Sequence, residues 1–193
     1  LDPFAEGVLI LCTGKLTKES SIYVNQRKKY LTKIVFGKET DTLDKTGKII
    51  KETSFLDFNE KNVKEKIKNF IGEIKQVPPA YSAKKILGIK MYDLARKNIF
   101  IKRKATNVFV YDIEIVNFKK NVLDLIITCG KGTYIRSLAR DIAYSLNTYA
   151  YVDSLQRISV GKFDKNNSIK FKDIDKCLLS IDSTIPTSWI VQL

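Results

Sequence analysis

Apolar residues recur with two different periods along the chain, and these periods predict where strands and helices lie. In residues 109–115 and 123–129 apolar and polar residues alternate, which is the pattern of a strand with one buried face. The run Lys119-Lys120-Asn121 separates the two segments, so we expect an antiparallel hairpin. The residues expected on its apolar side are Phe109, Tyr111, Ile113, Ile115, Leu123, Leu125, Ile127 and Cys129.

A helical period marks other parts of the chain. One helix is expected to begin after Asn59, which is a suitable N-cap, and to stop at Gly72. Another has the clearest apolar stripe in the chain, and Arg136 and Arg140 lie off that stripe, four residues apart on one face. The expected helices span about residues 16–25, 59–70, 91–97 and 135–146.

The remaining segments complete an α+β pattern. Residues 30–36 are rich in β-branched and aromatic side chains and predict a strand, whereas the polar, glycine-bounded residues 37–47 predict a loop. Residues 77–104 are basic and irregular, so we expect an excursion from the core there. We predict one α+β domain over residues 1–193 with a largely antiparallel sheet. Further strands are expected at residues 7–14, 48–53 and 157–163.

Charge points to an anionic partner. The 193 residues include 34 Lys and Arg against 21 Asp and Glu, which gives a net charge of +13. Such an excess is typical of proteins that bind nucleic acid, although lysines spread over the surface for solubility would give the same total. The hydrophobic content of 44% is ordinary for a folded globular protein.

Histidine is absent, which excludes a Ser-His-Asp triad and any histidine-ligated metal. The three cysteines, Cys12, Cys129 and Cys177, are far apart and match neither a zinc site nor a disulfide framework. Cys12 and Cys129 stand in apolar runs and are expected to be core residues. We therefore expect a reducing, cytoplasmic setting and no membrane helix, because no apolar run is long enough.

The first residues hold a candidate catalytic group. Asp2 precedes Pro3, and proline keeps the residue before it out of the helical region, so we expect Asp2 on an extended loop. Asp-Pro is also an ordinary start of a turn, and by itself it would not indicate catalysis. A resemblance that extends through four more segments changes that interpretation.

Five segments, in order, resemble the pseudouridine synthases of the TruB class, which isomerise a uridine in the T-loop of transfer RNA. Each segment alone is weakly specific, but their shared order and spacing cover nearly the whole chain. The segments are Leu1-Asp2-Pro3-Phe4-Ala5-Glu6-Gly7-Val8-Leu9, then Lys29-Tyr30, then Gly37-Lys38-Glu39-Thr40-Asp41-Thr42-Leu43-Asp44-Lys45-Thr46-Gly47, then Pro78-Pro79-Ala80-Tyr81-Ser82-Ala83-Lys84-Lys85 followed by Gly88 and Tyr92-Asp93-Leu94-Ala95-Arg96, and finally Lys131-Gly132-Thr133-Tyr134-Ile135-Arg136 with Leu155-Gln156-Arg157.

The resemblance implies a role for five residues. Asp2 matches the catalytic aspartate, which attacks the target nucleotide or otherwise starts glycosidic cleavage. Tyr30 matches the tyrosine that stacks on the target base, and Tyr134 and Leu155 match residues that line the uracil pocket. Arg136 matches the arginine that pairs with the catalytic carboxylate. Residues 77–104 resemble the RNA-gripping insertion called the thumb.

The same resemblance implies a transfer RNA partner, bound through its T-arm, and no cofactor, metal or obligate protein partner. Isomerising a uridine needs no redox change and no external group, and an ionised carboxylate is a sufficient nucleophile. The family pattern also implies residues before Leu1, so we interpret the chain as N-terminally truncated and expect weak activity or none from it alone. No complete C-terminal RNA-binding domain is expected within residues 1–193.

Each of these residues also has an ordinary structural explanation. Tyr30 could be a buried strand tyrosine, Tyr134 and Leu155 could be packing residues, and Arg136 could lie on a solvated helix face. Gly130-Lys131-Gly132 suggests a phosphate cradle but lacks the spacing of a P-loop. Asp41 and Asp44 suggest a cation loop but lack the spacing of an EF-hand. Two rival functions stay open: the same chemistry on another RNA, or a non-catalytic RNA-binding or chaperone module.

Overall fold

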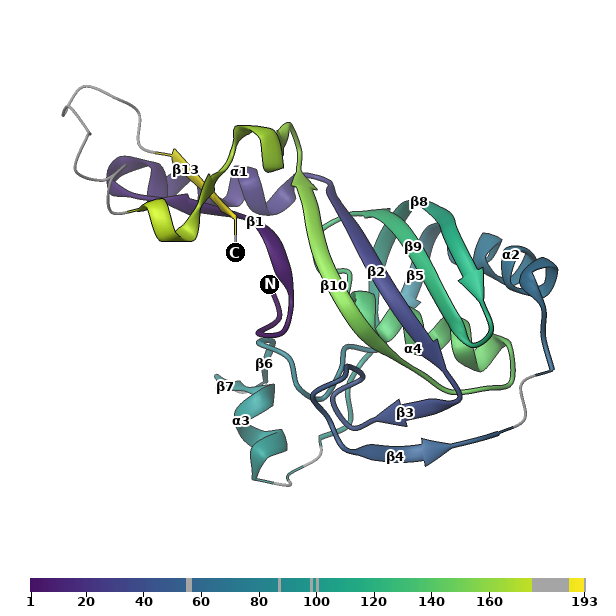
Figure 1. Cartoon of the computed structure of the whole chain (residues 1–193). Coiled ribbons are helices and arrows are strands. Elements are labelled where there is room, and N and C mark those ends of the chain that lie inside the picture. Colours follow the sequence, from purple (N-terminus) through teal and green to yellow (C-terminus); the bar gives the residue numbers. More distant parts are fainter. Residues whose placement is uncertain (55–56, 87, 98, 100, 175–187, 193) are drawn as a thin grey trace.

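A curved sheet forms the body of the protein in a computed structural model (Figure 1). The structure describes residues 1–193 except 55–56, 87, 98, 100, 175–187 and 193. Within the described residues the sheet has nine strands, and pairing is antiparallel except between β1 and β10 and between β12 and β13. The α+β prediction with a largely antiparallel sheet is therefore confirmed. In spatial order the strands are β12 (Ile169–Lys170), β13 (Ser188–Gln192), β1 (Glu6–Cys12), β10 (Ala150–Val160), β2 (Lys28–Phe36), β9 (Val122–Cys129), β8 (Thr106–Lys119) and β5 (Gly72–Gln76), with β11 (Phe163–Asp164) beside β10.

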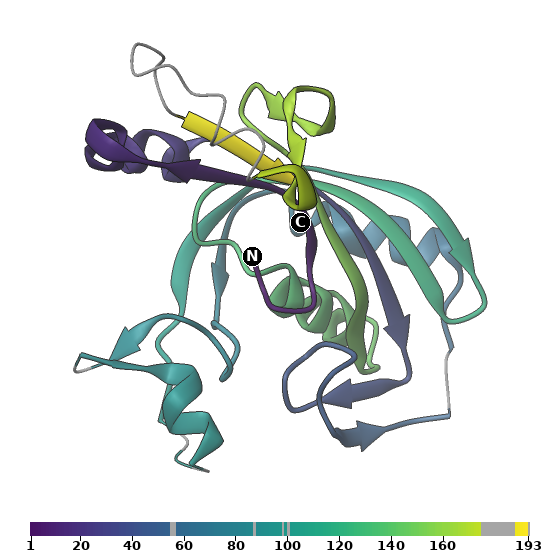
Figure 2. The ribbon, with the colours of Figure 1, turned by 60° about the vertical axis from the view of Figure 1, so that its left-hand side comes forward.

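Helices α2 (Glu60–Lys68) and α4 (Ile135–Ser145) cover one face of this sheet, and α4 lies within its curve (Figure 2). Asn59 caps α2 as predicted, since its side chain accepts a hydrogen bond from the backbone N–H of Asn62 at 3.1 Å. The predicted stripe of α4 packs on the sheet, and burying such apolar area stabilises the fold by roughly 25 cal/mol per Å². Its buried apolar residues are Ile135, Leu138, Ala139, Ile142 and Ala143.

The hairpin of β8 and β9 confirms the prediction for one strand and corrects it for the other. Leu123, Leu125, Ile127 and Cys129 are all buried along β9. In β8, however, Phe109 and Tyr111 are exposed, whereas Val108, Val110 and Ile113 are buried. The pairing register of β8 shifts between Val110 and Asp112, which is the effect of a β-bulge. An extra residue turns every following side chain to the opposite face, so a single alternation could not hold along the whole strand.

Other boundaries also differ from the sequence prediction. The predicted loop 37–47 contains β3 (Lys38–Thr40), which pairs with β4 (Ile49–Glu52). Strand β5 was not predicted, because its five residues directly follow the end of α2 and carry little pattern. The helix expected at 16–25 is a 3₁₀ helix (η1, Gly14–Glu19) followed by α1 (Ser20–Asn25). The strand expected at 157–163 begins earlier, at Ala150.

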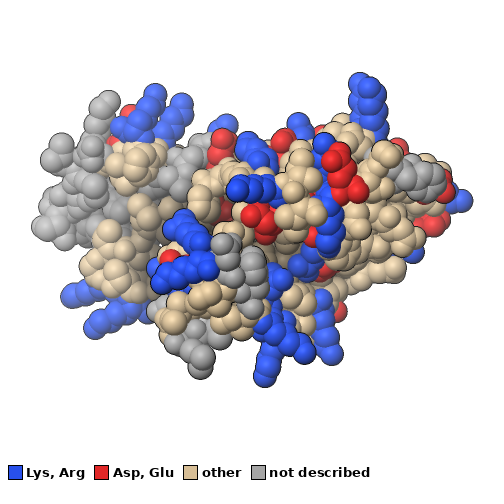
Figure 3. Space-filling model, turned by 90° about the horizontal axis from the view of Figure 1, so that it is seen from below, with Lys and Arg blue, Asp and Glu red and all other residues tan. Residues whose placement is uncertain are grey.

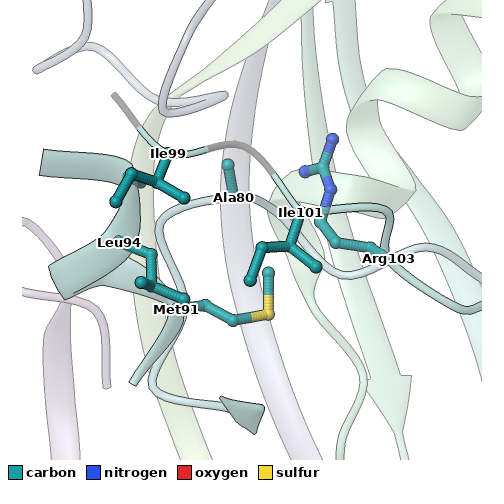
Figure 4. A pocket seen from close by; sticks show the side chains of 7 residues that line it. Ala80, Met91, Leu94, Ile99, Ile101 and Arg103 are labelled. Atoms are coloured by element: carbon teal, nitrogen blue, oxygen red, sulfur yellow. The ribbon is translucent and has the colours of Figure 1, made fainter. Parts of the chain in front are cut away.

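Residues 77–104 stand apart from the sheet, as predicted for an excursion (Figures 1 and 2). They contain the short hairpin of β6 (Lys85–Ile86) and β7 (Ile89–Lys90), followed by α3 (Met91–Arg96). Side chains of α3 and of the following segment enclose a cavity of about 30 Å³, which is large enough for one water molecule (Figure 4). The insertion therefore has a small apolar cluster of its own, in which Met91 and Ala95 are buried whereas Ile99 and Ile101 stay exposed. The cavity is lined by Ala80, Met91, Leu94, Ala95, Ile99, Ile101 and Arg103.

The end of the described chain returns to the sheet. Short 3₁₀ helices, η2 (Lys165–Asn167) and η3 (Phe171–Asp173), follow β10 and β11. Strand β13 then pairs antiparallel with β1, with Val8 opposite Gln192 and Leu9 opposite Val191. Of the cysteines, Cys129 is buried, Cys12 is half-buried and Cys177 lies outside the described residues. Across the part of the chain that the structure describes, every helix is too short or too polar to cross a bilayer.

Gly7 fixes how β1 leaves the loop that carries Asp2. Its φ of +104° is in the region that favours glycine, and a Cβ there would overlap the backbone carbonyl of Arg157 on β10. We expect Gly7→Ala to lower the free energy of unfolding by more than about 2 kcal/mol, because neither backbone can move aside cheaply. Gly14→Ala is the matched control, since Gly14 also has positive φ but faces open space. Urea denaturation of both variants measures the difference, and equal losses would contradict this account.

Candidate active site

Asp2 and Arg136 form a two-point ion pair at the start of α4. The Nη2 of Arg136 donates to Oδ1 of Asp2 at 2.8 Å, and its Nε lies 2.7 Å from Oδ2. The Nε contact lies outside hydrogen-bond geometry, so one hydrogen bond and one close charge contact together hold the carboxylate in position. The side chain of Arg136 is 4% exposed and that of Asp2 is 27% exposed, so the carboxylate is held from the interior and open on its outer side.

The rest of the Arg136 guanidinium is held by two other segments. Nη1 donates to the backbone carbonyl of Thr42 at 2.7 Å and to Oδ2 of Asp44 at 3.0 Å, and Nη2 donates to the carbonyl of Tyr81 at 3.0 Å. Arg136 therefore ties the N-terminal loop, the loop after β3 and the insertion to one helix. An arginine with these partners has no freedom to leave the carboxylate of Asp2.

Asp44 is itself fixed by its own loop. Its Oδ1 accepts hydrogen bonds from the backbone N–H of Thr46 at 3.0 Å and from the Thr42 hydroxyl at 2.8 Å, and the Thr46 hydroxyl donates to the same oxygen. The loop is attached to β10, because the N–H of Val152 donates to the carbonyl of Leu43 at 3.0 Å. These hydrogen bonds hold the carboxylate of Asp44 in a fixed position against the guanidinium of Arg136.

A cavity of about 220 Å³ opens beside Asp2, and its wall contains three of the other predicted residues. Tyr30 lies on β2 and Leu155 on β10, and Tyr134 is the N-cap residue that directly precedes α4. The structure therefore brings Asp2, Tyr30, Tyr134, Arg136 and Leu155 to one place. Leu1, Ala83, Thr133 and Ile135 complete the wall.

Tyr30 and Tyr134 have different surroundings in this wall. Burial raises the pKa of Tyr30 above its ordinary value, an effect that the positive charge of Arg157 partly opposes, so the phenol is neutral around neutral pH. Tyr134 donates its backbone N–H to Oε1 of Gln76 at 2.8 Å, and Gln76 is only 1% exposed. Burial thus favours the neutral form of Tyr30, and Gln76 anchors the backbone of Tyr134 at the start of α4.

A larger hollow of about 780 Å³ shares Leu1, Asp2 and Ala83 with the small cavity and extends to the insertion. Tyr81, Tyr92 and Arg96 of the insertion line it, and so does Arg136. Lys and Arg side chains project from much of the underside of the molecule, where the insertion lies (Figure 3). Among the described residues no group of three or more His, Cys, Asp or Glu is placed to hold a metal ion.

Comparison with known proteins identifies the family. A family model described as TruB family pseudouridylate synthase (N terminal domain) matches residues 1–135. The chain belongs to this family. It is 44% identical over 186 residues to tRNA pseudouridine synthase B of Borreliella afzelii (strain PKo), which covers 95% of this chain and 66% of that protein. It is 40% identical over 190 residues to the protein of the same name from Clostridium kluyveri, with 96% and 65% covered. The chain thus spans just under two thirds of the length of these curated relatives.

Two solved structures share the fold of this TruB-family chain. One is a Cbf5-Nop10-Gar1 complex, with a TM-score of 0.60 and 22% identity over 83% of this chain and 38% of the matched chain. The other is an H/ACA RNP bound to a substrate RNA containing 2'-deoxyuridine, with a TM-score of 0.56 and 18% identity over 86% and 40% of the two chains. At these identities the likeness shows a common fold.

The TruB-family site also contains residues that sequence reasoning missed. Asp44 stood in the third matching segment and in a possible cation loop but was given no role, yet it is 3% exposed and pairs with Arg136, which lies 92 positions away. Gln76 carried no signal at all, because a glutamine at the end of an unpredicted strand has no pattern of its own. Arg136 does not lie on a solvated helix face, since it is 3% exposed, and Arg140 donates to the carbonyl of Val77 at 3.2 Å.

Proposed function

We propose that this TruB-family protein isomerises a uridine in the T-loop of transfer RNA to pseudouridine, with Asp2 as the catalytic nucleophile. The observation that carries the proposal is the Asp2 carboxylate, held at two points by Arg136 at the mouth of the cavity between Tyr30 and Tyr134. The relatives named tRNA pseudouridine synthase B support transfer RNA as the substrate.

The reaction exchanges one bond to the ribose for another. The bond from N1 of uracil to C1′ breaks, the base turns within its cavity, and a bond from C5 to C1′ forms. C5 loses its proton and N1 gains one, so the product is an isomer and no oxidant, reductant or second substrate enters. An ionised carboxylate can begin this sequence by attacking the target nucleotide, and Arg136 keeps the carboxylate of Asp2 aimed at the cavity.

The cavity accounts for how the base is held while it is detached. A base in a folded loop has to leave its stack before an enzyme reaches it, and aromatic side chains then replace the lost stacking. Tyr30, Tyr134 and Leu155 offer such a surface in a space of about 220 Å³. The neutral phenol of Tyr30 avoids placing a negative charge beside the carboxylate of Asp2.

The insertion supplies the grip on the rest of the RNA. Arg96 lines the 780 Å³ hollow, and the other exposed basic residues lie elsewhere on the insertion. These cations can meet phosphates, so RNA binding is expected to weaken steeply with salt. This is the role expected of a thumb at residues 77–104. The exposed basic residues described in it are Lys84, Lys90, Arg96, Lys97, Lys102 and Lys104.

Tritium release tests the proposal directly. Transfer RNA transcribed with tritium at C5 of uridine should release one tritium per molecule into water, because C5 gives up its hydrogen when it bonds to C1′. A T-arm stem-loop should release the same amount, while a ribosomal RNA fragment without such a loop should release none. Tritium release from ribosomal RNA alone would mean that the protein carries out the same reaction on ribosomal RNA instead of transfer RNA. RNA binding without release from any RNA would support the non-catalytic alternative.

Substitutions of Tyr30 test the stacking role. Tyr30→Phe keeps the ring and is expected to retain most of the rate, whereas Tyr30→Leu should lower kcat/KM by about 10- to 100-fold, since base stacking on an aromatic ring contributes about 1–3 kcal/mol. Tyr111→Leu is the matched control, because Tyr111 is an exposed strand tyrosine that lines neither cavity described above. Equal activity of the two leucine variants would remove Tyr30 from the proposed site.

A further inference from the structure

A third cavity, of about 360 Å³, adjoins the small one on the side away from the insertion. It lies between β1, α1, the start of β2 and the loop 130–133. Leu1, Tyr30 and Thr133 line both this cavity and the 220 Å³ cavity, so Tyr30 and Thr133 form a shared wall. The three hollows therefore follow one another across the face that carries Asp2, with the smallest in the middle.

Three cations line the third cavity: Lys28, Lys131 and Arg157. Among the described residues that line it there is no Asp or Glu. Burial lowers the pKa of Lys28, and the positive charges of Arg157 and Lys131 lower it further, while Cys129 acts in the opposite direction. Lys28 therefore lies close enough to both other cations to be repelled by them. Like charges gathered without a carboxylate are unfavourable unless an anion joins them.

The fold holds two of these cations in place. Nε of Arg157 donates to the carbonyl of Val8 at 2.7 Å, which fixes the guanidinium against β1. Nζ of Lys28 donates to the carbonyl of Gln26 at 2.7 Å and to that of Val24, at the end of α1. Lys131 is exposed at the rim, in the Gly130-Lys131-Gly132 sequence that resembled a phosphate cradle. Two fixed cations and one flexible cation can close around a phosphate group.

Aromatic rings indicate what else the cavity accepts. Tyr23 lines it from α1, and Tyr30 lines it from β2. A phosphate with an attached base combines the negative charge and the flat apolar surface that this lining fits. Consecutive nucleotides are joined by one phosphodiester, so a base held on one side of Tyr30 leaves its neighbour within reach of the other side.

We infer that this third cavity binds the nucleotide next to the target uridine, with its phosphate between Lys28, Lys131 and Arg157 and its base against Tyr23. The inference rests on the proposed function, since it names a second part of the same RNA. Binding there would make this cavity a determinant of which nucleotide can flank the target uridine. That selection is separate from the reaction at Asp2.

Lys131→Ala tests the inference with little risk to folding, because Lys131 is exposed. Binding of a T-arm stem-loop that already contains pseudouridine is measured from 50 to 200 mM salt, so no turnover occurs. The slope of log affinity against log salt should fall by about 0.7 to 0.9, the value for one phosphate contact, with a several-fold loss of affinity at the lower salt concentrations. Lys119→Ala is the control, because Lys119 is an exposed lysine at the end of β8, opposite Val122 at the start of β9.

A second arm identifies the phosphate. Each phosphate flanking the modified nucleotide is replaced in turn by an uncharged methylphosphonate. At one position the replacement should weaken binding to the wild-type protein, and Lys131→Ala should then add no further loss. Equal salt slopes for Lys131→Ala and Lys119→Ala, or additive losses at every position, would overturn the inference. Tritium release by the wild-type protein decides the proposed function independently of either result.

Discussion

Replacing Asp2 by Asn is expected to abolish pseudouridine formation while RNA binding is largely kept. The amide preserves the size of the side chain but removes the negative charge that starts the reaction. Losing a catalytic nucleophile costs on the order of 10⁴-fold or more in rate, so single-turnover tritium release should fall to background. Affinity depends mainly on the cations that meet phosphates, and a fluorescence anisotropy titration with the same RNA should therefore change little.

Glu114→Gln is the control for the Asp2 substitution. Glu114 is an exposed acid on β8 and lines none of the three hollows. Its replacement removes one negative charge and should leave both rate and affinity as they were. Product formation that survives in Asp2→Asn would mean that another group starts the reaction. A collapse of binding in that variant would mean that Asp2 shapes the RNA site instead of acting on the base.

Replacing Arg136 by Met is expected to destabilise the protein strongly and to inactivate it. The substitution leaves the carboxylate of Asp44, which is 5% exposed, without the cation that faces it. Removing one partner of a buried ion pair typically costs about 3–5 kcal/mol, and urea denaturation measures that loss. Asp44→Asn should lower the free energy of unfolding less in the Arg136→Met background than in the wild-type protein. In that background the substitution removes the carboxylate that Arg136→Met has left without its cation.

Two further variants separate the effect of Arg136 from a general effect of lost charge. Arg27→Met removes an exposed arginine that stacks on Tyr111 at 3.9 Å, and it should cost no more than about 1 kcal/mol. Arg136→Lys keeps the charge but cannot contact Asp2, Asp44 and the carbonyl of Tyr81 together, so its rate should stay low even where it is folded. Wild-type rates in Arg136→Lys would contradict the positioning role.

The sequence predicted the parts of the fold whose pattern is local and unbroken. The stripe of α4 and the alternation of β9 each repeat over eight or more residues, and both are confirmed. The prediction of which face of β8 is buried was wrong for the first part of the strand, because a bulge interrupts the alternation and no single residue type marks a bulge. Strand β3 was missed because three residues paired with β4 are too few to show any period.

The candidate site was predictable only through the resemblance. Asp2, Tyr30, Tyr134, Arg136 and Leu155 do converge, but nothing in their own surroundings in the sequence predicts that. Their roles in the reaction stay predictions until the substitutions above are made. Asp44 was missed because its partnership with Arg136 exists only in three dimensions, and the same is true of Gln76 beneath Tyr134.

The pairing of β1 with β10 has a consequence for how the protein becomes active. Glu6 lies opposite Gln156, and Asp2 meets Arg136 across 134 positions of sequence. Contacts between residues so far apart in the sequence form late in folding, because the chain between them has to fold first. A nascent chain on the ribosome therefore lacks the Asp2–Arg136 pair until β10 has emerged, so turnover should appear only at the last stage of folding.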